Sequence, residues 1–225
     1  MKKNYSLIFA FLIVTNLSIA QKNSEPNQYF ENNGYGQLVK SFVMKGNKIS
    51  TVVFNYGSIS APTATGNVLD LAWIGLGYMY EANLLVGAKV QKFNSTDSLK
   101  IVSEGFSTPA DGEFGPDGTK WGWLPDSGYS NPNQNEIANN NNPNSWPSQW
   151  TSWQGKNGDA IADVETYAVM DDFTKKEFQY YPFPNDTTKR GLGLQVSTRM
   201  YQFDTPNLED MFLITYDIKN VSTKK

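Results

Sequence analysis

The sequence predicts an all-β protein with a β-sandwich-like domain that carries a long irregular insertion rich in Trp, Asn and Pro. Three observations lead to this fold class. Several short segments alternate apolar and polar residues with a period of two, which is typical of half-buried strands. Clusters of turn residues separate them, a pattern that favours a sandwich over a barrel. Beyond the first twenty residues, no segment of ten residues has a helical period.

The expected strands share a high content of Val, Ile, Thr and aromatic residues and are bounded by Gly, Pro, Asn or Asp. Gly75 and Gly77 interrupt one apolar stretch and indicate a bend or bulge. Residues 94–97 provide the turn of an expected hairpin. The expected strands are residues 48–56, 68–73, 83–93, 98–106, 165–173, 177–183, 192–203 and 210–221.

The last two expected strands have the clearest alternation. In one of them, Leu192, Leu194, Val196, Thr198 and Met200 face the core and Gln195, Ser197, Arg199 and Tyr201 face outward. In the other, Phe212, Ile214, Tyr216 and Ile218 face the core and Thr215, Asp217 and Lys219 face outward.

The insertion covers about residues 109–158 and follows neither a strand nor a helix period. It contains an Asn- and Pro-rich stretch at residues 131–144. A structureless loop of this length is unusual in a compact domain. Two interpretations remain open: an irregular segment pinned by its tryptophans, or a mobile functional loop.

The first twenty residues have the pattern of a signal peptide. Lys2 and Lys3 precede an apolar run at residues 7–19, and small residues allow cleavage between Ala20 and Gln21. We expect residues 21–36 to be a disordered leader and residues 37–225 to form the β domain. The apolar run is too short for a membrane span, so no transmembrane anchor is expected.

The composition excludes several kinds of chemistry, because the chain has no Cys and no His. Disulfides, thiol nucleophiles and thiolate zinc sites are therefore absent, as are the commonest general base and transition-metal ligand. The net charge is −3, and removal of the signal peptide makes it more negative. Such a chain has no basic field for a nucleic-acid backbone, so nucleic acid is not an expected partner.

Two groups of acidic residues are candidate sites. Asp111, Glu113 and Asp117 lie in a Gly-rich segment and could bind Ca²⁺, although their spacing differs from that of an EF-hand. The alternative is a pair of turns, since Asp-Gly is a strong turn dipeptide in its own right. In the second group, Asp163 and Glu165 are expected on one face of a strand, where paired carboxylates could hydrolyse a glycosidic bond. The alternative is solvated turns with one structural cation. The second group consists of Asp159, Asp163, Glu165, Asp171 and Asp172.

Aromatic residues concentrated in the insertion are the third candidate. Exposed Trp or Tyr rings could stack on sugar rings, and the alternative is that they are buried and pin a loop with few aliphatic residues. The candidate carbohydrate-binding residues are Trp121, Trp123, Tyr129, Trp146, Trp150 and Trp153.

Several short motifs occur in an order that resembles the amino-terminal domain of large exported proteins of Bacteroidetes-type bacteria. They are residues 47–57 with their Asn-Tyr-Gly end, Leu85-Val86-Gly87-Ala88, Lys120-Trp121-Gly122-Trp123, Asn144-Ser145-Trp146-Pro147, Val169-Met170-Asp171-Asp172, Arg190-Gly191-Leu192-Gly193-Leu194 and Ile218-Lys219-Asn220-Val221-Ser222. The resemblance implies further β modules and a type IX secretion sorting domain, so the chain is expected to be an amino-terminal fragment. It implies no activity.

From these observations we expect a non-catalytic exported structural or interaction domain, secreted or at the cell surface, or periplasmic if no sorting domain follows. Its expected partners are an extracellular glycan or downstream modules of the same protein. The alternatives are a carbohydrate-binding module that uses the Trp-rich loop and, third, a carboxylate-based glycoside hydrolase.

Overall fold

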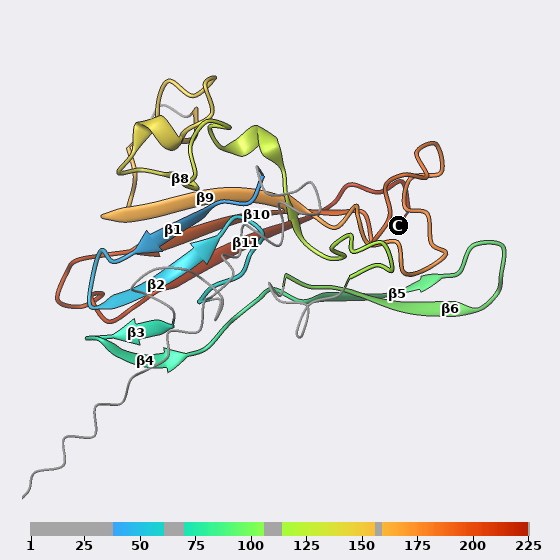
Figure 1. The fold of residues 1–225 in the computed structure, drawn as a ribbon, viewed down its shortest axis with the longest axis horizontal. Coiled ribbons are helices and arrows are strands. Elements are labelled where there is room, and N and C mark those ends of the chain that lie inside the picture. Colours follow the sequence, from blue (N-terminus) through green and yellow to red (C-terminus); the bar gives the residue numbers. More distant parts are fainter. Residues whose placement is uncertain (1–37, 61–69, 106–113, 156–158, 225) are drawn as a thin grey trace, which may run out of the picture.

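The computed structural model describes residues 38–60, 70–105, 114–155 and 159–224. Within these residues the protein is all-β, and its only helical elements are short 3-10 turns. The predicted all-β, sandwich-like fold class is confirmed. Figure 1 shows two antiparallel sheets and a separate hairpin.

The first sheet has the strand order β1-β2-β3-β4. Its strands are β1 (Ser41–Met44), β2 (Ile49–Phe54), β3 (Leu71–Trp73) and β4 (Leu76–Met79). Strands β3 and β4 meet at a tight turn where Ile74 and Gly75 have φ values of 49° and 79°. Gly readily adopts this left-handed conformation, which explains the predicted bend at Gly75.

The second sheet has the order β11-β10-β9-β7, with β8 also paired to β9. Its long strands are β9 (Val164–Asp171), β10 (Leu194–Gln202) and β11 (Leu213–Asn220). The insertion contributes the two short strands β7 (Leu124–Pro125) and β8 (Ala138–Asn139). Because β7 and β8 pair with β9, the insertion is part of this sheet.

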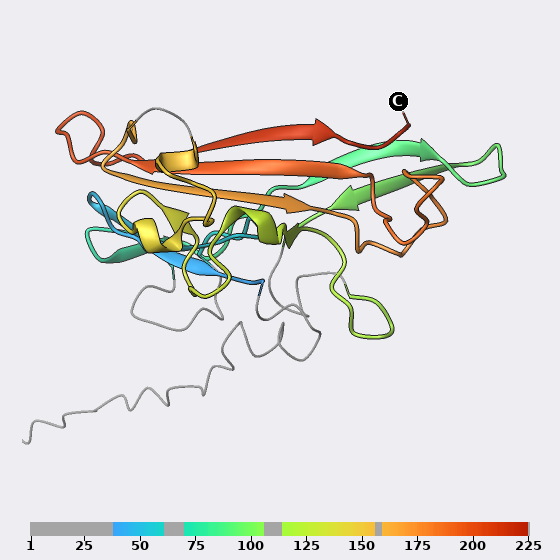
Figure 2. The same cartoon turned by 90° about the horizontal axis from the view of Figure 1, so that it is seen from above.

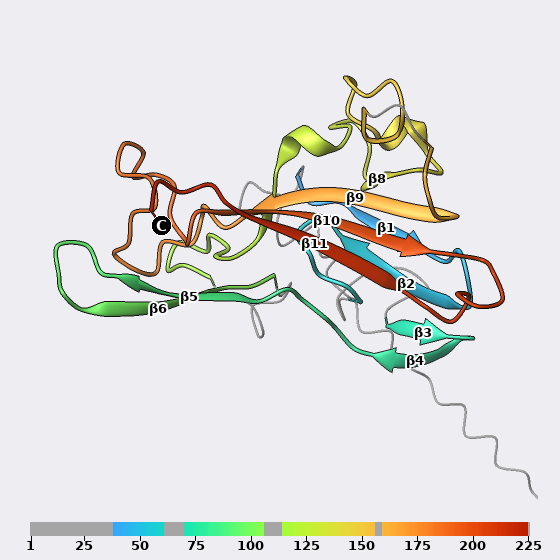
Figure 3. The same ribbon diagram turned by 180° about the vertical axis from the view of Figure 1, so that it is seen from behind.

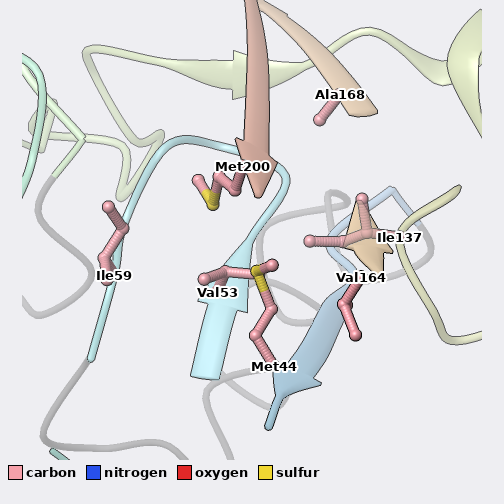
Figure 4. Packing of buried hydrophobic residues seen from close by; sticks show 7 residues of the cluster. All are labelled: Met44, Val53, Ile59, Ile137, Val164, Ala168 and Met200. Atoms are coloured by element: carbon pink, nitrogen blue, oxygen red, sulfur yellow. The ribbon is translucent and has the colours of Figure 1, made fainter. Parts of the chain in front are cut away.

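The main core lies between the two sheets. Figure 2 shows β9, β10 and β11, in orange and red, in one layer and the blue strands in the other. Met44 and Val53 of the first sheet belong to one buried cluster with Ala168 and Met200 of the second sheet. Figure 4 shows these residues with Ile59, Ile137 and Val164 in one cluster. Burial of this apolar surface holds the sheets together.

A second cluster extends the core toward the β5–β6 hairpin. Trp123, Met170 and Val196 are fully buried, and Leu84 and Val86 pack against them. The hairpin consists of β5 (Val86–Gln91) and β6 (Ser98–Ser103). Figures 1 and 3 show it extending toward the end of the molecule where the C-terminus lies.

Most of the strands predicted from the sequence are present, including the 94–97 hairpin turn and the inward positions of β10. Ile218 was expected inward but remains 45% exposed, because β11 is an edge strand. The strand predicted at residues 177–183 is wrong. Pro182 interrupts this segment and Pro184 follows it, and the aromatic rings of the segment pack in turns instead.

The described part of the insertion is irregular, as predicted. Apart from β7 and β8 it contains three 3-10 turns, η1 (Ser127–Tyr129), η2 (Pro143–Ser145) and η3 (Trp153–Gly155). The predicted signal peptide with its Ala20–Gln21 cleavage site and the predicted leader lie outside the described residues.

Candidate functional site

A groove lies on the outer face of the second sheet, opposite the core. The register places Arg199 of β10 between Tyr167 of β9 and Thr215 of β11, and Ser197 opposite Asp217. Because side chains alternate along a strand, these five residues share one face while their neighbours Ala168, Thr198 and Met200 are buried in the core. The sheet therefore provides a floor of mixed aromatic and polar side chains.

The insertion forms a wall beside this floor, and Figure 1 shows it standing over β9. Tyr129, Trp150 and Gln154 line the groove together with the floor residues and Tyr201, and its volume is about 420 Å³. The ring of Tyr167 lies 5.8 Å from that of Trp150 and 6.0 Å from that of Tyr129, measured between centroids. These contacts gather three aromatic rings from two distant parts of the chain.

The wall is held in place by buried hydrogen bonds. Trp153 packs behind Trp150, with 5.8 Å between ring centroids, and its indole N–H donates to Glu165 Oε2 at 2.7 Å. Glu165 Oε1 accepts from the backbone N–H groups of Ile161 and Ala162 at 2.5 and 3.0 Å. A buried carboxylate with several donors fixes the loop around it. The groove is therefore shaped before any ligand arrives.

Two buried donors at the groove have no hydrogen-bond partner. They are Arg199 Nε and Gln154 Nε2. Another nitrogen of the same guanidinium, Arg199 Nη2, lies 3.7 Å from Glu165 Oε2. The backbone of Gln154 has a φ of 58°, a value that is uncommon for non-Gly residues. Unpaired buried polar groups are rare in proteins and need an explanation. Both nitrogen atoms are shielded from solvent.

Burial raises the pKa of the Tyr167 phenol, and the nearby charge of Arg199 and a hydrogen bond with Ser197 oppose the rise. The phenol is consequently neutral at physiological pH and can both donate and accept a hydrogen bond. Neutral hydroxyl groups on the ligand would match this floor.

The structure brings Tyr129 and Trp150 to the groove and distributes the other predicted carbohydrate-binding residues elsewhere. Trp123 is fully buried in the core, and its indole N–H donates to the Leu84 carbonyl. Trp146 donates to the Asn139 carbonyl at 2.6 Å, and like Trp153 it supports the wall. Trp121 lies beside the turn at Gly115.

The predicted calcium site is only partly within the described residues, because Asp111 and Glu113 lie outside them. The Asp117 carboxylate accepts from the backbone N–H of Thr119 at 3.0 Å, and this bond lowers its pKa. The described residues contain no cluster of three acidic residues suited to a metal ion. Calcium binding at this segment stays a prediction.

The residues of the second acidic group do not form one site: some are exposed at the surface, and others are buried hydrogen-bond acceptors that hold loops. Asp163 is exposed and accepts from the Asp204 N–H, whereas Glu165 is buried. Asp172 accepts from the N–H groups of Leu192, Gly193 and Leu194 and from Ser103 Oγ. Glu165 and Asp172 thus serve as hydrogen-bond acceptors for loops.

Burial raises the pKa of Asp171 to about 6, and the neighbouring Asp172 and Asp126 carboxylates add to the rise. Burial also raises the pKa of Asp172, against the effect of its hydrogen bonds. These shifts follow from desolvation of carboxylates within the fold. They do not by themselves indicate catalysis.

Several groove residues were not among the candidates from the sequence, namely Gln154, Tyr167, Ser197, Arg199, Tyr201, Thr215 and Asp217. Most of them were predicted as outward-facing strand residues. The missing information was that the insertion folds over this face of the sheet and not another.

Comparison with protein-family models, curated proteins and solved structures found no match. Among the described residues there is no helix that is long and apolar enough to span a membrane.

Proposed function

We propose that this protein is a non-catalytic, exported carbohydrate-binding domain, and that the groove on β9–β11 takes a neutral oligosaccharide. The observation that carries this proposal is the combination of three aromatic rings, those of Tyr129, Trp150 and Tyr167, with the polar side chains of Arg199 and Gln154 in one preformed groove.

The chemistry of a sugar matches both kinds of surface in the groove. The C–H face of a pyranose ring is apolar and packs on flat aromatic rings such as Trp150 and Tyr129. Its hydroxyl groups can accept hydrogen bonds from the exposed part of the Arg199 guanidinium and can pair with the Tyr167 phenol. A volume of about 420 Å³ is in the ordinary range for a ligand site. It has room for a short stretch of a polysaccharide chain.

The carboxylates near the groove favour binding over hydrolysis. Of the residues that line it, Asp217 is the one that carries a carboxylate. Glu165 pairs with Arg199 and already accepts hydrogen bonds from Trp153 of the insertion and from Ile161 and Ala162, which follow the insertion. Glycoside hydrolysis uses two carboxylates that flank the scissile bond. The same residues therefore give the third hypothesis, a hydrolase, little support.

The exported location rests on the signal-peptide pattern that ends at Ala20. The resemblance to amino-terminal domains of large exported proteins supports a place as the first module of a longer secreted or cell-surface protein. In that setting a binding groove would hold the rest of the protein on an extracellular glycan.

The first test replaces Trp150 with alanine and measures binding of neutral hexasaccharides by calorimetry, with cello-, xylo-, manno- and laminari-hexaose as the probes. We expect the wild type to bind at least one of them and Trp150→Ala to weaken that binding by about tenfold or more, because a central aromatic ring commonly contributes about 2 kcal/mol. The purified protein should not release reducing ends from the same sugars.

Trp73→Ala is the matched control, since Trp73 is a 40% exposed tryptophan on the first sheet. It should leave affinity unchanged. Equal loss of affinity in both variants, or no binding of any neutral hexasaccharide by the wild type, would contradict the proposal. Release of reducing ends that Asp217→Asn abolishes would replace it with a hydrolase.

A further inference from the structure

A second cleft lies at the opposite end of the molecule, between the tip of the β5–β6 hairpin and the loop that precedes β10. It has two adjoining parts of about 470 and 440 Å³ that share Phe93, Tyr181 and Lys224. Figures 1 and 3 show the hairpin and this loop side by side near the C-terminus. Neither part shares a residue with the groove on β9–β11.

Backbone hydrogen bonds fix the walls of the cleft. The Phe93 N–H donates to the Gln179 carbonyl at 3.0 Å, which ties the hairpin to the loop. The N–H and hydroxyl of Thr223 both lie 3.1 Å from the Pro182 carbonyl, which ties in the last described residues. The cleft is therefore formed from three segments that are joined by specific contacts.

Arg190 is positioned inside this framework. Its guanidinium donates to the carbonyls of Tyr180 and Phe178 and lies 4.5 Å from the centroid of the Tyr181 ring. The Phe93 ring meets Tyr181 edge-on at 5.0 Å and remains 54% exposed. An exposed aromatic ring thus stands next to a held positive charge.

The charge of the cleft is opposite to that of the protein. Lys89, Lys92, Arg190 and Lys224 line it, and neither part is lined by Asp or Glu. Among the described residues, none of these four cations forms a salt bridge. The whole chain, in contrast, has 22 acidic and 19 basic residues. Four like charges at one place repel one another, and an anion would relieve that repulsion.

We propose that this cleft binds an acidic saccharide, a chain of sugar rings that carries carboxylate groups. The lysines and Arg190 pair with the carboxylates, and the Phe93 and Tyr181 rings pack on the sugar rings between them. A nucleic acid offers the same alternation of rings and charges, but the net negative charge of the protein opposes a long polyanion of that charge density. The proposal does not depend on the function assigned to the other groove.

Hexagalacturonate is the probe, and its fully methyl-esterified form is the ligand control, because it has the same rings without the charges. We expect the purified protein to bind hexagalacturonate in calorimetry at low ionic strength, to bind it more weakly as salt is added, and to bind the ester at least about tenfold more weakly. Equal affinity for the acid and the ester would overturn the proposal, as would no binding of hexagalacturonate.

The test variant replaces Lys89, Lys92 and Lys224 with Gln and retains Arg190, which holds the loop. The control variant replaces Lys45, Lys176 and Lys219, three exposed lysines elsewhere, and has the same net charge. We expect the first variant to lose about tenfold in affinity, because three exposed ion pairs together contribute about that much to binding. The second variant should lose less than about twofold. An equal loss in both would overturn the proposal by showing that only net charge matters.

Two further measurements complete the test: hexagalacturonate binding by the Phe93→Ala variant, and binding of a short single-stranded DNA by the wild type. Phe93→Ala keeps every charge and removes the exposed ring, so it should weaken hexagalacturonate binding without changing its salt dependence. Single-stranded hexathymidylate should bind more weakly than hexagalacturonate. Tighter binding of the DNA would overturn the assignment of a saccharide. Trp150→Ala should leave hexagalacturonate affinity unchanged, which separates this cleft from the groove on β9–β11.

Discussion

At each end of β9, a buried carboxylate accepts hydrogen bonds from a loop and holds that loop in place. At the start of the strand, the buried Glu165 accepts from Trp153, Ile161 and Ala162 and fixes the insertion. Just beyond its end, the buried Asp172 accepts from three backbone N–H groups of the segment before β10 and from Ser103. Each carboxylate therefore organises a loop that is largely irregular.

The two ends differ in what the organised loop presents to solvent. Next to Glu165, the insertion presents Trp150 and Tyr129 over a floor of hydroxyl groups, one arginine and one aspartate. Next to Asp172, the loop presents Arg190 and Tyr181 toward the lysines of the hairpin. A buried acid in this fold therefore marks where a loop is fixed, and the ligand chemistry lies in the side chains around it.

The largest expected effect is on Asp172. Asp172→Ala leaves four donors without their acceptor in a buried site, so we expect the free energy of unfolding to fall by about 3–5 kcal/mol. Asp172→Asn retains one acceptor oxygen and should cost less. Urea denaturation measures both. A loss below about 1 kcal/mol for the alanine variant would show that Asp172 does not hold the loop.

Substitution of Asp171, the neighbour of Asp172, should raise the free energy of unfolding at neutral pH, whereas substitution of Asp172 lowers it. The pKa of Asp171 rises from 3.8 to about 6 on folding, so its contribution to stability is fully present below pH 4 and is lost as the pH rises through 6. Asp171→Asn removes a buried charge and should raise the free energy of unfolding at pH 7 by up to about 3 kcal/mol.

This gain should shrink as the pH falls and vanish near pH 4, which urea denaturation between pH 4 and 8 would follow. Asp97→Asn changes an exposed carboxylate on the hairpin tip and is the control. A gain that does not vary with pH would mean that the Asp171 carboxylate is not desolvated in the folded protein.

Glu165→Gln should have the smallest effect on stability and the most local one. Gln retains one acceptor oxygen but loses the charge, so we expect a loss of about 1–2 kcal/mol. Hydrogen exchange should speed up at Ile161 and Ala162 and stay unchanged at Leu192 and Leu194. Equal acceleration at both ends of β9 would show that the two loops are not held independently.

The strands could be predicted from the sequence because alternation is a local property. The inward positions Val196, Thr198 and Met200 follow directly from it, and the structure buries all three. The aromatic segment at residues 177–183 does not follow this rule, since its rings pack on Phe93, Arg190 and Phe173 and not within a sheet. Aromatic residues favour strands only where a neighbouring strand is present to pair with them.

The sequence by itself determined the all-β class, the irregular insertion and the absence of thiol and imidazole chemistry, because alternation and composition do not depend on what lies across the fold. The folded arrangement, and no local pattern, sets which acids are buried anchors, which tryptophans face solvent, and which sheet face the insertion covers. These properties depend on contacts between residues far apart in the chain, such as Trp153 with Glu165 and Trp150 with Tyr167. No local pattern contains that information.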